Sequence, residues 1–411
     1  MGYISRLSAI LYLPSFRWFW LGSSIQSVAQ ATQFLAIGWL VLEVTGSSAQ
    51  LGLVIFLYGV PNVAFLLLAG VAADRFDRRY VLIITQSGVG CLIAILGLLT
   101  LADVIAIWHI YTAAAGLGVI QSLNMPARMT MVSDLVDQGS LLDAVAMQNA
   151  AVHAGRIVGP PIAGMIIEIW GLSASLMAIA ACYLLSVACV ANIGRTSQSE
   201  PVTGQSVFRN FADGISFIKK TPLVLTVIVI TCSFGGFGMS HLQILPAMAK
   251  DTLAVGAAGV GLLYLASGIG SLIGNVLLPL LGTSYIYRSM LTSVALFALF
   301  LTVFAWSDWF WFSWVMFLLV GIFGLGAVWP FSSTILQLES PSDVRGRVMG
   351  VLQFTPGFHF LGAFPLALLA GEWSWSIALT LAAGATVLVA FWFGLMRKGA
   401  PSLSGRVTAV E

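Results

Sequence analysis

Charged residues are scarce in this sequence. Asp, Glu, Lys and Arg together make up only 8% of its 411 residues, whereas soluble domains carry roughly 25%. So few charges cannot cover the surface of a soluble protein of this length, and 59% of the residues are hydrophobic. The composition therefore excludes a cytosolic enzyme, a nucleic-acid binder and a secreted disulfide scaffold. It predicts a protein that is surrounded mostly by lipid.

Cysteine is also rare, and catalytic motifs are absent from the sequence. The four cysteines have no paired spacing and lie in apolar runs: Cys91, Cys182, Cys189 and Cys232. We interpret them as small hydrophobic residues rather than as a disulfide or metal framework. The sequence contains no phosphate-binding loop, no zinc-type histidine cluster and no Gly-x-Ser-x-Gly motif. We therefore expect no enzyme activity, no cofactor and no metal, with energy coming from gradients rather than from ATP.

Long apolar runs are abundant instead. A helix needs about 20 apolar residues to cross a bilayer. Twelve segments meet this requirement: 17–42, 49–73, 80–101, 105–125, 141–168, 171–192, 223–247, 256–282, 288–306, 309–334, 345–370 and 374–396. The predicted fold class is an all-α membrane protein with twelve transmembrane helices. Since the number of spans is even, both termini lie on one side of the membrane.

The distribution of Lys and Arg predicts the orientation of these spans. With the N-terminus in the cytoplasm, all Lys and Arg residues except Lys250 and Arg156 fall on the inner side, Arg128 included. Tryptophans such as Trp306 and Trp309 gather at the outer ends, as in an aromatic belt. We therefore expect both termini to be cytoplasmic.

The one long polar break divides the chain into two halves. We predict an N-terminal six-helix bundle at 1–193, a cytoplasmic linker at 194–222 and a C-terminal six-helix bundle at 223–411. Residues 208–220 of the linker have the spacing of a basic amphipathic helix, the alternative being a plain tether. The halves also match one another at offsets of 209, 204 and 203 residues, in the pairs Arg79 and Arg288, Pro126 and Pro330, and Gly159 and Gly362. Two six-helix pseudo-repeats of this kind predict a substrate site where the halves meet.

The loop between the second and third spans carries the strongest motif. It reads Gly70-Val-Ala-Ala-Asp-Arg-Phe-Asp-Arg-Arg79 and resembles the signature Gly-x-Leu-Ala-Asp-Arg-x-Gly-Arg-Lys of the major facilitator superfamily. Within that superfamily the chain looks most like the bacterial efflux branch that contains the enterobactin exporter and macrolide efflux proteins. The resemblance implies a cytoplasmic gate in which Asp74 pairs with the start of the eleventh span. The expected gate residues are Gly70, Asp74, Arg75, Asp77, Arg78, Arg79, Arg345 and Arg347.

A second motif lies in the fifth span. It is similar to the antiporter motif Gly-x-x-x-Gly-Pro-x-x-Gly-Gly of superfamily drug exporters, with its matching residues at Gly155, Gly159, Pro160 and Gly164. Small residues spaced four apart form a face for close helix packing. We expect Gly270 and Gly274 of the eighth span to supply the opposing face. The alternative is generic packing of small residues without a role in transport.

Polar residues inside the spans mark a predicted substrate cavity. Arg156 is the one charge near the middle of a span, and it shares a helical stripe with Asn149 and His153. A lone cation in lipid is costly, so Arg156 should face the cavity or cap carbonyls that the Pro kink frees. Gln26, Gln30 and Gln33 form a second stripe suited to a cavity wall. Gln121 and Asn124 are expected to form hydrogen bonds between helices.

The sequence departs from proton-coupled members of the superfamily in two respects. Thr112 stands where many of them carry an Arg, and no Asp or Glu lies in the middle of a span. Proton coupling is therefore implied by the resemblance alone. The predicted function is export of a small organic molecule of the drug or siderophore type by alternating access, coupled to protons, by a monomer in a bacterial cytoplasmic membrane. The alternatives are a facilitator or importer of a nutrient or lysophospholipid, and a membrane sensor or partner that transports nothing.

Overall fold

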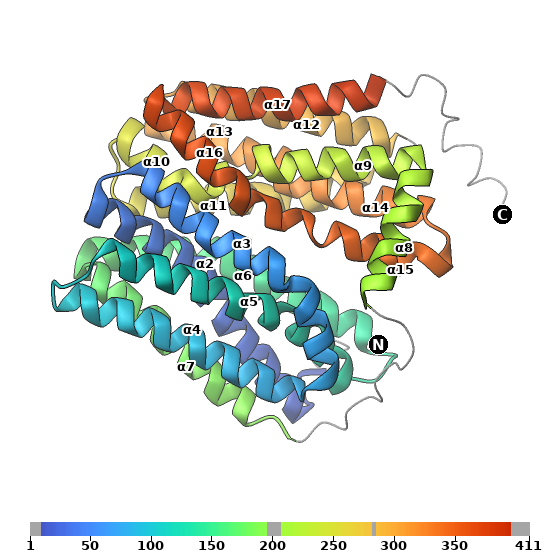
Figure 1. The fold of residues 1–411 in the computed structure, drawn as a ribbon, viewed down its shortest axis with the longest axis horizontal. Helices are drawn as coiled ribbons and strands as arrows, with labels where there is room; N and C mark the ends of the chain where they lie inside the picture. Colours follow the sequence, from blue (N-terminus) through green and yellow to red (C-terminus); the bar gives the residue numbers. More distant parts are fainter. Residues whose placement is uncertain (1–9, 195–206, 282–284, 396–411) are drawn as a thin grey trace. The chain divides into compact units, whose positions relative to one another are not determined.

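The computed structural model describes residues 10–194, 207–281 and 285–395. Within these ranges the chain is built from helices, with no β-strand. It divides into two compact units (Figure 1). Unit 1 comprises Met1–Val207 and Ala254–Leu265, and unit 2 comprises Phe208–Leu253 and Ala266–Glu411.

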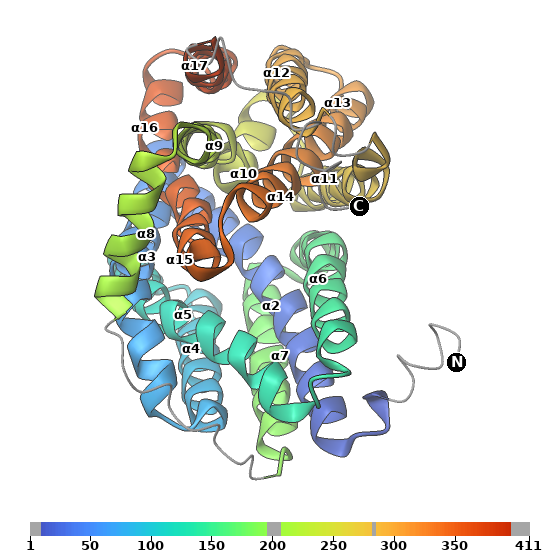
Figure 2. The same cartoon turned by 90° about the vertical axis from the view of Figure 1, so that its right-hand side faces the viewer.

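Unit 1 contains six long helices. These are α2 (Pro14–Thr45), α3 (Ser48–Arg75), α4 (Arg78–Leu101), α5 (Ile107–Leu135), α6 (Leu141–Trp170) and α7 (Leu172–Ala191). Helix α2 packs against α6 and α7, α3 packs against α5, and α4 packs against α5 and α7 (Figures 1 and 2). The connections are short, and α6 passes into α7 through Gly171 alone, whose φ of +85° favours glycine.

Unit 2 contains shorter and more interrupted helices. These are α8 (Val207–Lys220), α9 (Pro222–Ser233), α10 (His241–Thr252), α12 (Ile286–Ala305), α13 (Phe310–Phe323), α14 (Trp329–Glu339), α15 (Ser342–Leu352), α16 (Phe358–Glu372) and α17 (Trp375–Leu395). Helix α11 (Ala257–Leu277) begins in unit 1 and continues into unit 2, where the 3₁₀ turn η2 (Leu278–Leu281) follows it.

Short turns that are not α-helical interrupt the predicted seventh, tenth and eleventh spans. The π-helical turn η1 (Phe234–Gly238) separates α9 from α10, and η3 (Gly324–Val328) separates α13 from α14, while the 3₁₀ turn η4 (Thr355–Gly357) lies between α15 and α16. A Cβ at Gly362 of α16 would lie only 1.7 Å from the Gly236 carbonyl oxygen. The missing side chain therefore lets α16 pack directly on the backbone of η1, and π-helical turns of this kind often accompany functional sites.

Ten segments of the described chain are long and apolar enough to cross a membrane. Two of the twelve predicted spans do not meet the test. Helix α5 is long but carries many polar residues in its interior, and α16, at 15 residues, is too short because η4 separates it from α15. The sequence therefore predicts the helical class correctly, whereas the count of twelve spans remains a prediction.

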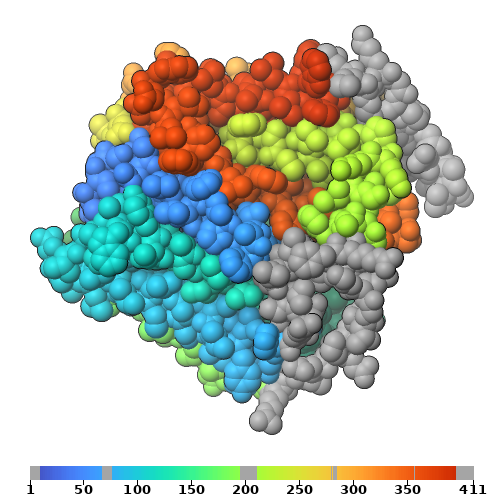
Figure 3. Space-filling model, in the orientation of Figure 1, coloured from blue at the N-terminus to red at the C-terminus, as the bar shows by residue number. Residues whose placement is uncertain are grey.

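The outer surface of unit 1 is apolar where α4 forms it. Ile84, Ile95, Leu98 and Leu101 of this helix are all more than half exposed, and the space-filling view shows α4, in light blue, across the face of the unit (Figure 3). Exposed apolar side chains of this kind are suited to contact with lipid tails.

Candidate functional site

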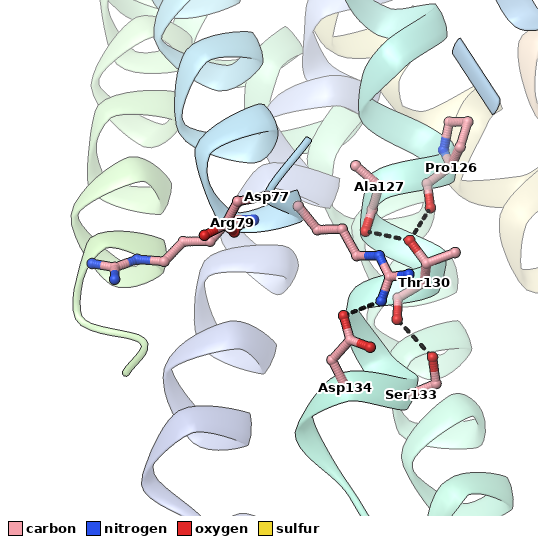
Figure 4. Close-up of polar contacts among 8 residues, drawn as sticks. Asp77, Arg79, Pro126, Ala127, Thr130, Ser133 and Asp134 are labelled. Carbon is pink, nitrogen blue, oxygen red and sulfur yellow. Dashed lines mark hydrogen bonds and ion pairs between the residues drawn. The ribbon is translucent and has the colours of Figure 1, made fainter. Parts of the chain in front are cut away.

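The start of α4 is held by Asp77, which the sequence assigned to the gate. Its carboxylate accepts a hydrogen bond of 2.9 Å from the backbone N–H of Arg79 and so caps the helix (Figure 4). This explains why Asp replaces the glycine of the superfamily signature at this position. The side chains of residues 67–75 lie outside the described part of the chain, so the gate predictions for Gly70, Asp74 and Arg75 are not tested.

The next two gate residues connect α4 to its neighbours within unit 1. Arg78 forms an ion pair with Asp134, which lies near the end of α5 (Figure 4). The side chain of Asp134 is only 3% exposed. Arg79 donates to the backbone carbonyl of Ala191 at the end of α7. The two arginines in the first turn of α4 therefore join the start of this helix to the ends of α5 and α7. Sequence reasoning did not predict Asp134 as the partner of Arg78.

The remaining gate residues lie on α15 in unit 2. Arg345 donates through Nε to the Ser340 carbonyl at 3.2 Å, which satisfies the end of α14. Arg347 forms an ion pair with Asp213 of α8, with 3.5 Å between Nη1 and Oδ2. The sequence predicted a helix in the linker, and the structure shows in addition that this helix docks on α15.

Close packing supports the contact between α8 and α15. A Cβ at Gly214 of α8 would lie 3.0 Å from the carbonyl oxygen of Arg347. The rings of Phe211 and Phe354 lie 5.0 Å apart, centroid to centroid. The contact thus combines a glycine face, an aromatic pair and an ion pair, and α8 is held more firmly than a plain tether would be.

The antiporter-like motif of α6 makes close contacts along its glycine face. Cβ atoms at Gly155 and Gly159 would lie 2.6 Å from the Ser27 carbonyl carbon and 2.8 Å from the Val28 carbonyl oxygen of α2. At Gly164 a Cβ would lie 2.3 Å from the carbonyl oxygen of Ala257, at the start of α11. Helix α6 therefore approaches both neighbours at backbone distance.

The glycine of α11 that faces α6 is not one that we predicted. A Cβ at Gly261 would lie 2.7 Å from the carbonyl oxygen of Pro160. Gly270 and Gly274 instead pack on Leu318 and on Ile322 and Gly326. The prediction of a Gly270–Gly274 face for α6 is wrong because these residues lie more than two helical turns beyond Gly261 along α11.

The stripe of glutamines on α2 is directed largely into the bundle of unit 1. Gln26 is fully buried; it donates to Asn124 at 2.6 Å and accepts from Gln86 at 3.0 Å. Gln33 accepts a hydrogen bond of 2.9 Å from the Tyr183 hydroxyl, and Gln30 is partly exposed. The expected hydrogen bonding of Asn124 between helices is confirmed. A role of the three glutamines in a cavity wall stays a prediction.

A group of polar residues lies exposed or partly exposed on α6. Asn149 and Arg156 are exposed and His153 is partly buried. Arg156 makes no hydrogen bond or ion pair with the residues that the structure describes, so the structure gives no support to the capping of freed carbonyls. Arg128, which we assigned to the inner side of the membrane, is only 8% exposed, and its guanidinium lies 3.5 Å from the Ser27 hydroxyl.

No metal cluster is present among the described residues. No group of three or more His, Cys, Asp or Glu side chains within the described ranges is arranged to hold an ion.

Comparison with known proteins gives a match over nearly the whole chain. Residues 7–402 match a family model described as transmembrane secretion effector. The chain is 28% identical to the multidrug efflux pump Tap of Mycolicibacterium fortuitum, covering 84% of this chain and 88% of that protein. It is 23% identical to the staphyloferrin A transporter of Staphylococcus aureus, with coverage of 82% and 84%. It is 25% identical to the enterobactin exporter EntS of Escherichia coli, with coverage of 85% and 83%.

Solved structures also resemble the chain. The nucleoside transporter NupG has a TM-score of 0.74 at 16% identity, covering 94% of this chain and 99% of that one. A bacterial homologue of the lysosomal transporter Spinster, in an inward-facing and unoccupied conformation, has a TM-score of 0.67 at 13% identity, covering 96% of each chain. At these identities the likeness concerns the fold alone.

Proposed function

Because the chain belongs to the transmembrane secretion effector family of the major facilitator superfamily, we propose that it exports a small organic molecule of the drug or siderophore type. The observation that carries the proposal is the match of the family model over residues 7–402. The relatives named above include a multidrug efflux pump and an enterobactin exporter. The chain itself is a multi-pass membrane transporter and not an enzyme.

The proposed mechanism is alternating access by two six-helix halves in a bacterial cytoplasmic membrane, with both termini cytoplasmic. The halves are 1–193 and 223–411, joined by a linker at 194–222. Two findings support this arrangement. The chain divides into two compact units, and the first long segment of unit 1 ends at Val207, inside that linker, although Ala254–Leu265 also belongs to unit 1. Ten segments of the described chain can span a membrane. In this proposal α5 and the α15–α16 pair supply the other two spans. Helix α5 can cross the membrane despite its polar residues because groups such as the Asn124 amide form hydrogen bonds inside the bundle.

The cytoplasmic gate of this mechanism is formed by Asp74 and its neighbours together with the start of α15. Asp77 and Arg78 hold the beginning of α4 in place, which supports a rigid loop at this position. An acid near the positive end of a facing helix stabilises the contact by about 0.3–2 kcal/mol. A contact of this strength changes the populations of two conformers substantially without making either one permanent.

Protons drive export in this proposal, and the substrate cavity includes Asn149, His153 and Arg156. Support comes from the exposure of Asn149 and Arg156 on α6, next to a glycine face that packs at backbone distance. The chain acts as a monomer.

The test is flux in proteoliposomes under imposed pH gradients of either sign. The panel contains cationic drugs and anionic siderophores. The variants are Asp74→Asn and, as a matched control, Asp137→Asn, which changes an exposed acid of unit 1 outside the gate. We expect outward transport of at least one compound that requires the acid outer side, is lost in Asp74→Asn and survives in Asp137→Asn. Accumulation in the opposite direction would establish an importer, and a wild type that moves no compound would leave a sensor or partner as the function.

A further inference from the structure

Arg128 is a buried cation of unit 1 that forms no ion pair with a carboxylate in the described part of the chain. Its side chain is 8% exposed, and among the described residues its guanidinium makes one hydrogen bond, of 3.5 Å, to the Ser27 hydroxyl. A bond of that length is weak. A buried charge without a partner is strongly unfavourable, so a guanidinium in this position calls for an anion.

A second guanidinium lies beside the same residue. Gly155 of α6 packs against the backbone of Ser27, with 2.6 Å between a Cβ built on the glycine and the serine carbonyl carbon. Arg156 is the next residue, and its side chain is exposed and makes no hydrogen bond or ion pair with the described residues. Arg128 and His153 each have an electrostatic interaction with Arg156. Helices α5 and α6, which carry the two arginines, therefore both meet α2 at Ser27.

The positions of Arg128 and Arg156 along their helices correspond to the middle of a membrane. Ser27 lies 13 residues after Pro14, the first residue of α2, which corresponds to roughly 20 Å along the helix. Arg156 lies 15 residues into α6, or roughly 22 Å. Arg128 is nearer the end of α5, but helical side chains lean toward the N-terminus of their helix, and this brings its guanidinium back to the level of Ser27.

The carboxylates of the described part of unit 1 are engaged elsewhere or lie at helix ends. Asp134 pairs with Arg78. Glu168 accepts a hydrogen bond of 3.2 Å from the backbone N–H of Ala258 at the start of α11. Asp143 is in the first turn of α6, 13 residues before Arg156. Within the described part of unit 1, then, no carboxylate pairs with either guanidinium, and a bound anion can supply the balancing charge.

We propose that Arg128, Arg156 and the Ser27 hydroxyl form a binding site for an organic polycarboxylate. A planar guanidinium binds the two oxygens of a carboxylate in a bidentate manner. An anion with two or more such groups satisfies both arginines at once, whereas a monoanion leaves one of them unpaired. The inference rests on the proposed function, because it makes this anion the exported cargo and places its site on the N-terminal bundle.

The first experiment measures binding of citrate to the full-length protein in nanodiscs by titration calorimetry. Arg128→Gln and Arg156→Gln should each weaken citrate binding at least tenfold. Arg128→Lys keeps the charge but loses the bidentate geometry of the guanidinium, so its affinity for citrate should lie between those of the wild type and Arg128→Gln. Arg17→Gln, at the exposed start of α2, is the matched control and should stay within twofold of wild type. Benzoate, a monocarboxylate, should bind at least tenfold more weakly than citrate.

Two results would overturn the inference: no citrate binding by the wild type, or an equal loss of affinity in Arg17→Gln. If Arg128→Gln fails to fold, the exposed Arg156→Gln supplies the same test. The flux panel separates this inference from the proposed function. Outward flux of a cationic drug without citrate binding contradicts the anion site and leaves the exporter standing. Citrate binding without flux of any compound contradicts the exporter and leaves the anion site standing.

Discussion

Arg347 of α15 and Asp213 of α8 form an ion pair across 3.5 Å, with side chains that are 29% and 46% exposed. A pair exposed to this degree contributes only about 0–1 kcal/mol to stability. Its importance lies in position, because Arg347 is also one of the predicted gate residues. The linker helix therefore contacts the chain segment that is expected to close the cytoplasmic side.

Neutralising the linker side of this pair should affect transport more than stability. Asp213→Asn removes the ion pair and leaves the packing of Phe211 on Phe354 in place. We expect a change in transport rate of at least threefold and a loss of stability below about 1 kcal/mol. Flux in proteoliposomes and thermal unfolding of the same preparation measure the two effects. Asp308→Asn, an exposed acid elsewhere in unit 2, should alter neither, and an equal effect in both variants would refute a role for α8.

The helix cap at Asp77 gives a prediction about stability. Asp77→Ala removes the acceptor of the Arg79 N–H, and the loss of such a cap costs about 1 kcal/mol. Asp77→Asn keeps an acceptor oxygen and should stay within about 0.5 kcal/mol of wild type. Denaturant or thermal unfolding in detergent measures both. Equal destabilisation by Ala and Asn would mean that the carboxylate acts through its charge and not as a cap.

The glycine face of α6 gives a prediction about packing. Gly155→Ala and Gly164→Ala each place a methyl group within 2.6 Å of a neighbouring backbone, and overpacking of this kind costs about 1–3 kcal/mol. Both variants should lower the melting temperature and slow transport. Gly346→Ala is the control, since a Cβ there meets no atom within 4 Å; in a helix this change should be neutral or slightly stabilising. Wild-type stability in Gly155→Ala would show that α2 and α6 are not in close contact.

Features encoded in local sequence could be predicted, whereas contacts that depend on three-dimensional neighbours could not. The lengths of the apolar runs predicted the positions of most helices, and the spacing of small residues between Gly155 and Gly164 predicted a face for close helix packing. Arg128 was assigned to the inner side of the membrane because it lies just beyond the predicted span 105–125. Its burial depends on Ser27 of another helix, some 100 residues away, and the sequence contains no local signal for that contact. The docking of α8 on α15 escaped prediction for the same reason, since amphipathic spacing does not identify a partner.

The buried ion pair between Arg78 and Asp134 allows a double-variant test of the loop that carries the gate. Asp134 is 3% exposed, and Asp134→Asn leaves the Arg78 charge without this partner. In a fully buried pair such a change lowers stability by about 3–5 kcal/mol. Because Arg78 is 20% exposed, we expect a smaller loss of about 1–3 kcal/mol. Adding Arg78→Gln removes the uncompensated charge and should restore at least half of the lost stability. Thermal unfolding of the two single variants and the double variant measures this coupling. Strictly additive losses would mean that the two side chains stabilise the protein independently, and that the pair does not join α4 to α5.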